Sequence, residues 1–308
     1  MCKGNLPMAQ LQQESPGRYV MKDLYLFNCK REILARKLET LPIKIPLKSI
    51  RPETALRRAL SLNLDQKRYT FEESSFEKVN DKPVQIILSR EALSSGDIDA
   101  TVGKAYVERG RIEVNTTYPE IRNSLENGFR FHMETAITRD LSVLVTKYLT
   151  ACMGIPVRPK NGEIYFALEK YIPEVLELMT VIDSLGQEST IRVSPVVGDE
   201  VQKVVERAHD HFRTSVENLM RLTEEISDET HTKTLNTRLK DARDLLDQAA
   251  AYEIGLGMEL EEVKGKIQEA KSKIAERLLG KPAASRHPEE TGSSAAYMAS
   301  SNGQLDLI

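Results

Sequence analysis

The sequence predicts an α+β protein: an antiparallel β meander and a helix–β-hairpin unit, then a long C-terminal helical hairpin and a disordered tail. Three observations predict this class. Apolar residues alternate with a period of two between Arg68 and Asn115, and they recur at three- and four-residue steps after Gly198. From Lys281 onward apolar residues are nearly absent. We therefore expect four regions, namely 1–117, 118–197, 198–280 and 281–308.

The first region begins with residues that we expect to form a loop up to about Gly17. The next stretch, "RYVMKDLYLFNCKREILARKLETL", mixes strand-like and helix-like patterns that the sequence alone does not separate. The two prolines of "LPIKIPLKSI" exclude a helix interior and predict an extended connector. "RPETALRRALSL" predicts a short helix, because Pro52 lies near its start and the apolar residues that follow form one stripe.

Four strand-like segments follow the short helix: "RYTFEE", "PVQIILSREAL", "DIDATVGKAYV" and "RIEVN". The intervening "VNDK", "SSGD" and "ERGR" have the composition of turns. Short strands joined by short turns predict an antiparallel meander.

The middle of the chain predicts helices in "YPEIRNSLENGF" and in "METAITRDLSVLVTKYLTACMG", the second of which we expect to end at Gly154. "IPVRPKNGEIYFA" predicts a β-hairpin, because Asn161 and Gly162 both accept positive φ. A helix followed by such a hairpin indicates a winged-helix-like unit. A further helix, "PEVLELMTVIDSLG", and a strand, "STIRVSPVV", complete this region.

Beyond Gly198 the apolar steps predict two long helices with a polar break at "SDETHT". We expect them to form an antiparallel, coiled-coil-like hairpin through which the protein could self-associate. Gly255, Gly257 and Gly265 would each cost roughly 1 kcal/mol relative to Ala, which predicts bending in the second helix.

Composition limits the possible functions. The chain has 43 basic and 46 acidic residues and a net charge of -3, which argues against a generally basic surface for nucleic acid and leaves room for a local basic patch. Aromatic residues are 6% and Trp is absent, which argues against base-stacking platforms. Three widely spaced cysteines indicate a reducing, cytoplasmic location. No apolar run has the form of a signal peptide or a membrane span, so we expect no membrane partner.

The segment "QLDLI", which follows the polar tail, resembles the bacterial sliding-clamp-binding motif, whose usual form is Gln-Leu-Ser/Asp-Leu-Phe. Gln304, Leu305, Asp306 and Leu307 match this form, and Ile308 replaces the aromatic residue. The resemblance implies that Gln304 hydrogen-bonds at the rim of the clamp pocket and that the apolar side chains fill its subsites. Chance occurrence and docking of the tail on the protein's own body are the alternative explanations.

Two segments of the body, "RPETALRRALSL" and "GIPVRPKNGEIYF", are similar to a group of uncharacterised proteins of bacteria and their phages. That group pairs an Ala-x-Arg-Arg-Ala helix with a later Arg-Pro hairpin. This chain has Asn161-Gly162-Glu163 where a Gly-Gly pair is common in the group. The resemblance implies a bacterial or phage source and no particular activity.

The remaining candidate site residues are charged. Asp97, Asp99 and Glu113 are weak candidates for a Mg²⁺ site, and alternating polar residues on a half-exposed strand are the favoured explanation. Arg57, Arg58, Arg158 and Lys160 are possible nucleic-acid contacts. His209 and His211 are two residues apart on a helix and so do not share a metal. No phosphate-binding loop, nucleophile elbow or zinc motif is present, so we expect no cofactor.

These features predict a non-enzymatic accessory or regulatory protein of DNA replication or repair, encoded by a bacterium or a phage, that associates with the bacterial sliding clamp. A metal-dependent nuclease or nucleotidyltransferase tethered to the clamp is the first alternative. A structural protein that assembles through its helical hairpin is the second alternative.

Overall fold

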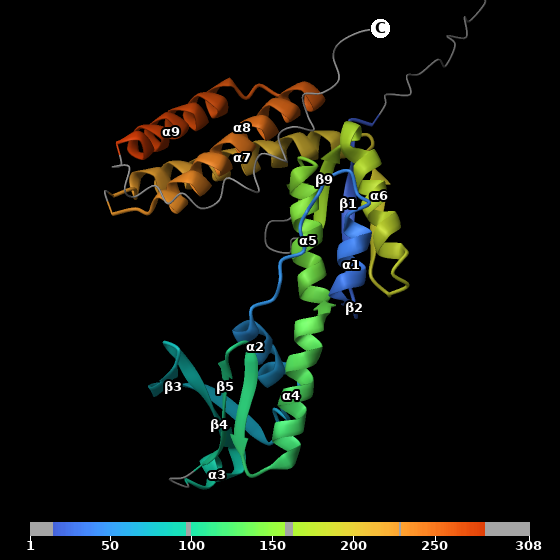
Figure 1. The fold of residues 1–308 in the computed structure, drawn as a ribbon. Helices are drawn as coiled ribbons and strands as arrows, with labels where there is room; N and C mark the ends of the chain where they lie inside the picture. Colours follow the sequence, from blue (N-terminus) through green and yellow to red (C-terminus); the bar gives the residue numbers. More distant parts are fainter. Residues whose placement is uncertain (1–14, 97–99, 158–162, 228, 281–308) are drawn as a thin grey trace, which may run out of the picture. The chain divides into compact units, whose positions relative to one another are not determined.

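The computed structural model describes residues 15–96, 100–157, 163–227 and 229–280. The chain divides into two compact units, with the boundary between Val196 and Val197. The first unit combines helices with antiparallel sheets, and the second is helical (Figure 1). This mixture of helices and antiparallel sheets confirms the predicted α+β class.

A four-stranded antiparallel sheet in the first unit joins distant parts of the chain, in the order β10-β1-β9-β8. Its strands are β1 (Gly17–Asp23), β8 (Ile155–Pro156), β9 (Ile164–Leu168) and β10 (Thr190–Pro195). Val20 of β1 lies between Val193 and Tyr165 in this sheet. The hairpin of β8 and β9 is therefore present, but it belongs to a larger sheet rather than to a separate wing. In this sheet β1 comes from the predicted region 1–117, and β8, β9 and β10 come from the predicted region 118–197.

Helices pack against this sheet around a common core. They are α1 (Arg31–Leu38), α5 (Thr138–Ala151) and α6 (Ile172–Asp183), with a 3-10 turn, η1 (Glu169–Tyr171), before α6. Val20, Leu34, Leu141 and Val175 are fully buried together in this core. A two-stranded antiparallel pair, β2 (Asn28–Lys30) with β7 (Thr135–Ile137), lies at the start of α1 and α5. The described residues contain no helix that is both long and apolar enough to cross a membrane.

The predicted meander is confirmed as a second four-stranded antiparallel sheet in the order β3-β4-β5-β6. Its strands are β3 (Tyr69–Val79), β4 (Lys82–Ser89), β5 (Thr101–Glu108) and β6 (Arg111–Thr116). Asn80 and Asp81 have φ angles of 51° and 61°, so the β3–β4 turn has the two left-handed residues that a tight hairpin needs.

Two helices, α2 (Pro52–Leu62) and α4 (Pro119–Glu134), contribute to the core of the meander. Leu60, Ile87 and Leu125 bring α2, β4 and α4 together in this core, where all three are fully buried. The predicted short helix with Pro52 at its start is therefore confirmed. The sequence reading missed one short helix, α3 (Arg90–Ser95), whose first turn is capped by the Ser89 hydroxyl.

The extended connector between α1 and α2 has no regular secondary structure, as its prolines predicted. Ile43, Ile45 and Leu47 pack against the core of the first sheet, whereas the alternate residues Lys44 and Lys48 are exposed. This alternation follows from an extended backbone, in which successive side chains point in opposite directions.

The second unit contains three helices among its described residues, where the sequence predicted two. They are α7 (Glu200–Glu224), α8 (Thr232–Leu256) and α9 (Glu261–Leu279). The predicted second helix ends at Gly257, which has a left-handed backbone with φ of 64° and so terminates α8. Leu219, Leu235 and Ile274 contribute one residue from each helix to a shared buried core.

One predicted helix end is also displaced. We expected Gly154 to terminate the helix that begins near Met133, but α5 ends at Ala151 and Met153 has the left-handed backbone, with φ of 56°. Gly154 serves packing instead, because a Cβ atom there would lie 2.8 Å from the carbonyl oxygen of Leu149.

Candidate nucleic-acid interface

Several residues singled out from the sequence lie outside the described part of the chain. They are Asp97, Asp99, Arg158, Lys160 and the pentapeptide Gln304–Ile308. Of the remaining candidates, Glu113 is exposed on the edge strand β6, opposite Tyr106. Within the described residues, no three His, Cys, Asp or Glu side chains are grouped as metal ligands.

Arg57 and Arg58 are neighbours on α2 but have different surroundings. Arg57 is exposed and forms an ion pair with Glu73 of β3, and Lys82 of β4 pairs with Glu53 in the first turn of the same helix. These two pairs join α2 to the β3–β4 hairpin. Arg57 therefore remains at the surface, where solvent screening makes its ion pair weak.

Arg58 is largely buried, and it binds Asp140 at the start of α5 through two nitrogens. The distances are 2.9 Å to Oδ2 and 2.7 Å to Oδ1. Arg31 of α1 donates to Oδ2 of the same carboxylate at 2.7 Å, and the backbone N–H of Ile137 donates to it at 3.2 Å. Burial alone would raise the pKa of Asp140, but the hydrogen bonds from Arg58 and Ile137 outweigh it and hold that pKa below its ordinary value.

A buried histidine lies beside this pair of arginines. His132 of α4 is 2% exposed, and its Nε2 lies 3.1 Å from Oδ1 of Asn63. Within the described part of the chain its Nδ1 has no hydrogen-bond partner. Burial, and then the charge of Arg58, lower the pKa of His132. The hydrogen bonds of Arg31 and Arg58 with Asp140 therefore join α1, α2 and α5, and the contact of His132 with Asn63 joins α4 to the end of α2.

Arg31 also fixes the connector. Its second terminal nitrogen donates to the backbone oxygen of Lys48 at 3.0 Å. Lys44 donates to the carbonyl oxygens of Glu39 at 2.5 Å and Leu41 at 2.6 Å, near the end of α1. The path of the connector, and with it the direction of its lysines, is therefore fixed by side-chain hydrogen bonds at both ends.

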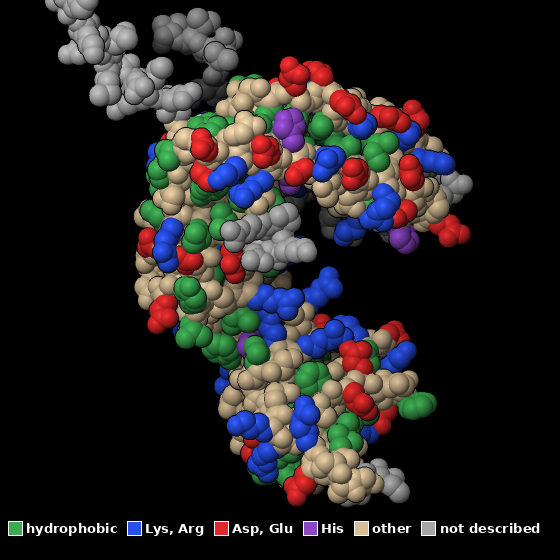
Figure 2. Space-filling view, turned by 180° about the vertical axis from the view of Figure 1, so that it is seen from behind, with side chains coloured by type: hydrophobic (Ala, Val, Ile, Leu, Met, Phe, Trp, Pro, Cys, Tyr) green, Lys and Arg blue, Asp and Glu red, His purple; other side chains and the backbone are tan. Residues whose placement is uncertain are grey.

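The connector and the flanking helices form a locally basic stretch. Between Lys30 and Arg58 there are nine Lys or Arg residues and three Glu residues, a local charge of +6 in a chain whose net charge is -3. Figure 2 shows Lys and Arg side chains gathered over the segment that joins α1 to α2. We call this the basic connector surface and define it by its exposed members, Lys44, Lys48, Arg51 and Arg57.

Lys48 and Arg51 are the members of this surface that are most available to a ligand. Both are exposed, and the charge of Arg51 also acts on Glu53 in the first turn of α2. Phosphate oxygens are the ligands that such exposed cations bind in nucleic acids. The sequence reading missed Lys44, Lys48 and Arg51, although the alternation of Ile, Lys, Ile, Pro, Leu and Lys in the connector was the signal that could have found them.

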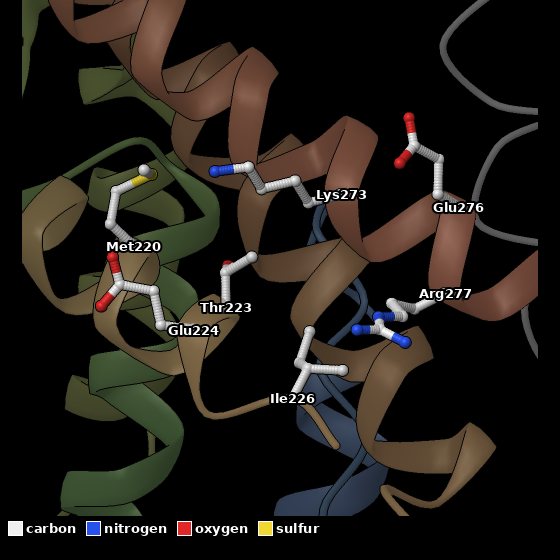
Figure 3. A pocket seen from close by; sticks show the side chains of 7 residues that line it. All are labelled: Met220, Thr223, Glu224, Ile226, Lys273, Glu276 and Arg277. Carbon is white, nitrogen blue, oxygen red and sulfur yellow. The ribbon is translucent and has the colours of Figure 1, made fainter. Parts of the chain in front are cut away.

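A separate hollow of about 380 Å³ lies within the helical unit. Figure 3 shows Met220, Thr223 and Glu224 of α7 and Lys273, Glu276 and Arg277 of α9 around it, together with Ile226. Its lining combines apolar side chains with charges of both signs, and Lys273 is also paired with Glu269. This mixture does not specify one class of ligand.

The described geometry is that of an α+β protein that carries a locally basic surface. The chain matches the model of a family of unknown function (DUF6744) over residues 28–284, and it belongs to that family. No curated protein and no solved structure matches it. The matched residues contain both body segments that resembled an uncharacterised group, as well as the basic connector surface. The pentapeptide Gln304–Ile308 lies beyond them.

Proposed function

We propose that the protein is a sliding-clamp-associated accessory or regulatory protein of DNA replication or repair, from a bacterium or a phage. The observation that carries the proposal is the pentapeptide Gln304–Ile308, four of whose residues match the clamp-binding form. In this proposal Leu305, Leu307 and Ile308 enter apolar subsites of the clamp, and each contributes about 1.5–3 kcal/mol before ordering costs.

The polar segment 281–303 serves as a tether in this proposal. Its 23 residues would have a root-mean-square span of roughly 25 Å if they behave as a flexible linker. A tether of this kind keeps the folded units close to the clamp and to the DNA that it encircles. The second interaction then benefits from a high effective concentration and does not need high affinity of its own.

The basic connector surface supplies that second interaction, with the DNA backbone. Lys44, Lys48 and Arg51 offer two or three phosphate contacts, which corresponds to a salt dependence with a slope of about -2 to -3 in a logarithmic plot. Contacts of this number give weak binding without sequence preference. Such binding suits an accessory protein that the clamp delivers to its site.

Fluorescence anisotropy with purified bacterial sliding clamp tests the proposal. A labelled peptide covering Ser300–Ile308 and the full chain should both bind with a Kd on the order of micromolar. Leu307→Ala should weaken binding by emptying an apolar subsite, and Gln304→Ala by removing the hydrogen bonds at the rim. Ser301→Ala, outside the pentapeptide, is the matched control and should change nothing. Absence of binding at high micromolar clamp, for peptide and full chain alike, would refute the clamp association.

The contribution of the basic connector surface is tested separately with duplex DNA. Lys48→Glu combined with Arg51→Glu should abolish the salt-dependent binding of the full chain and leave its affinity for the clamp unchanged. Lys67→Glu combined with Lys78→Glu, at exposed positions outside this surface, makes the same charge change and should have a smaller effect. Equal loss in both double variants would show that only net charge matters.

A further inference from the structure

The loop between β1 and β2 holds two large apolar side chains in solvent. Tyr25 is 60% exposed and Leu26 is 79% exposed. The residues on either side are anchored, because Phe27 is 3% exposed and Leu24 packs against the same core. The loop therefore buries its outer side chains and presents the two central ones.

Hydrogen bonds fix the backbone of this loop. The Thr138 hydroxyl donates to the carbonyl oxygen of Tyr25 at 2.8 Å and accepts from the N–H of Phe27 at 3.0 Å. The Ser189 hydroxyl donates to the same Tyr25 oxygen at 3.2 Å. A backbone held from two elements presents Tyr25 in a fixed position, which lowers the entropy cost of binding a ligand on its ring.

The loop lies beside the cationic cluster at the start of α5. Thr138, which holds the loop, is followed by the exposed Arg139 and then by Asp140, which binds Arg31 and Arg58. Arg31 in turn binds the backbone of Lys48. The backbone from Thr138 to Asp140 and the hydrogen bonds of Arg31 therefore link the loop that holds Tyr25 to the connector.

We propose that Tyr25 is a base-stacking residue and that the basic connector surface with Tyr25 binds an unpaired strand of nucleic acid. A single strand combines phosphates, which suit Lys48, Arg51 and Arg139, with exposed base faces, which suit an aromatic ring. A duplex offers the same phosphates but keeps its bases stacked inside. The inference rests on the DNA contact in the proposed function and specifies the form of its ligand.

The test compares a labelled oligothymidylate of about 15 nucleotides with a duplex of the same length, using the full chain and fluorescence anisotropy. Tyr25→Ala should weaken binding of the single strand about 10-fold and change binding of the duplex less than about twofold. Tyr25→Phe keeps the ring and should bind the single strand like the unchanged chain. Tyr118→Ala is the matched control, because Tyr118 is 40% exposed at the far end of α4.

A second measurement does not depend on a substitution. Photocrosslinking of the unchanged chain to an oligonucleotide that contains 5-iodouracil, followed by mass spectrometry, should place a crosslink on the peptide that contains Tyr25. Crosslinks confined to other peptides, or equal losses for single strand and duplex in Tyr25→Ala, would overturn the stacking role alone. If the unchanged chain binds neither form of DNA, the DNA contact of the proposed function fails with it, whereas clamp binding is judged by its own experiment.

Discussion

The meander and the first sheet of the same unit are both four-stranded and antiparallel, yet they are assembled differently. Each strand from β3 to β6 pairs with its neighbour in the sequence, through turns such as Asn80-Asp81. In the other sheet Val20, near the start of the unit, lies between Val193 and Tyr165, which come from its C-terminal part. The first arrangement closes short loops and the second closes very long ones. Local signals can therefore specify the meander, whereas only the complete chain specifies the other sheet.

The largest expected effect comes from truncating one buried leucine in each region. Leu125 belongs to the core of the meander and Leu141 to the core of the other sheet, and both are fully buried. Leu125→Ala and Leu141→Ala should each lower the free energy of unfolding by about 2–5 kcal/mol. Amide hydrogen exchange should accelerate mainly in β3–β6 for the first variant and mainly in β1, β9 and β10 for the second. The same pattern of acceleration in both variants would show that the two regions unfold as one.

This difference also explains how much of the fold could be predicted. The strands of the meander, the helix at Pro52 and the extended connector follow from alternation, turn composition and proline. The pairing of β1 with β9 and β10 leaves no local signal, because any half-buried strand has the same pattern. The end of α8 depended on which of three glycines would adopt the left-handed backbone, and in the structure it is Gly257.

The next largest effect is expected at Asp140, whose ion pair with Arg58 joins the first sheet's region to the meander's region. Asp140→Ala would leave Arg58 and Arg31 largely buried without their carboxylate, and it should cost about 3 kcal/mol in chemical denaturation. Glu53→Ala removes the partly exposed partner of Lys82 and should cost less than about 1 kcal/mol. A similar small loss in both variants would mean that water replaces the carboxylate of Asp140.

His132 should give the stability a pH dependence. Because its pKa in the folded chain is below the ordinary 6.5, the unfolded chain binds the proton more readily. This contribution to stability is complete above about pH 6.5 and is lost as the pH falls below that value. Between pH 7.5 and 5.5, His132→Gln should reduce the fall in Tm by about 2–4 °C. His211 of the helical unit also has a pKa lowered by burial. His211→Gln is therefore the control, because it shows how much of the pH dependence comes from the helical unit.

The smallest effect is expected in the tight turn that joins β3 to β4 of the meander. Asp81 has a φ of 61°, a conformation that glycine adopts without strain. Asp81→Gly creates the Asn-Gly sequence that such turns favour and should stabilise the chain by about 0.5 kcal/mol. Thermal unfolding of this variant should show a small rise in Tm, and a fall would show that the side chain of Asp81 matters more than its backbone.

The candidate site was predictable only in part, for physical reasons. Arg57 and Arg58 stood out as adjacent charges, but the sequence could not distinguish the exposed pair with Glu73 from the buried pair with Asp140. Asp140 is distant from both in the chain and gave no signal of its own. The role of Tyr25 could not be predicted for a similar reason. Nothing in the neighbouring sequence indicates that Thr138 and Ser189 hydrogen-bond to its backbone.

The alternation of buried apolar residues and exposed lysines restricts the length that the connector can have. Ile43, Ile45 and Leu47 must keep even spacing to face the core, which leaves Lys44 and Lys48 outside. Loss or gain of a single residue here would exchange the two sets, burying lysines and exposing isoleucines, whereas a change of two residues would preserve the arrangement. Length differences in this segment between members of the family should therefore occur in steps of two.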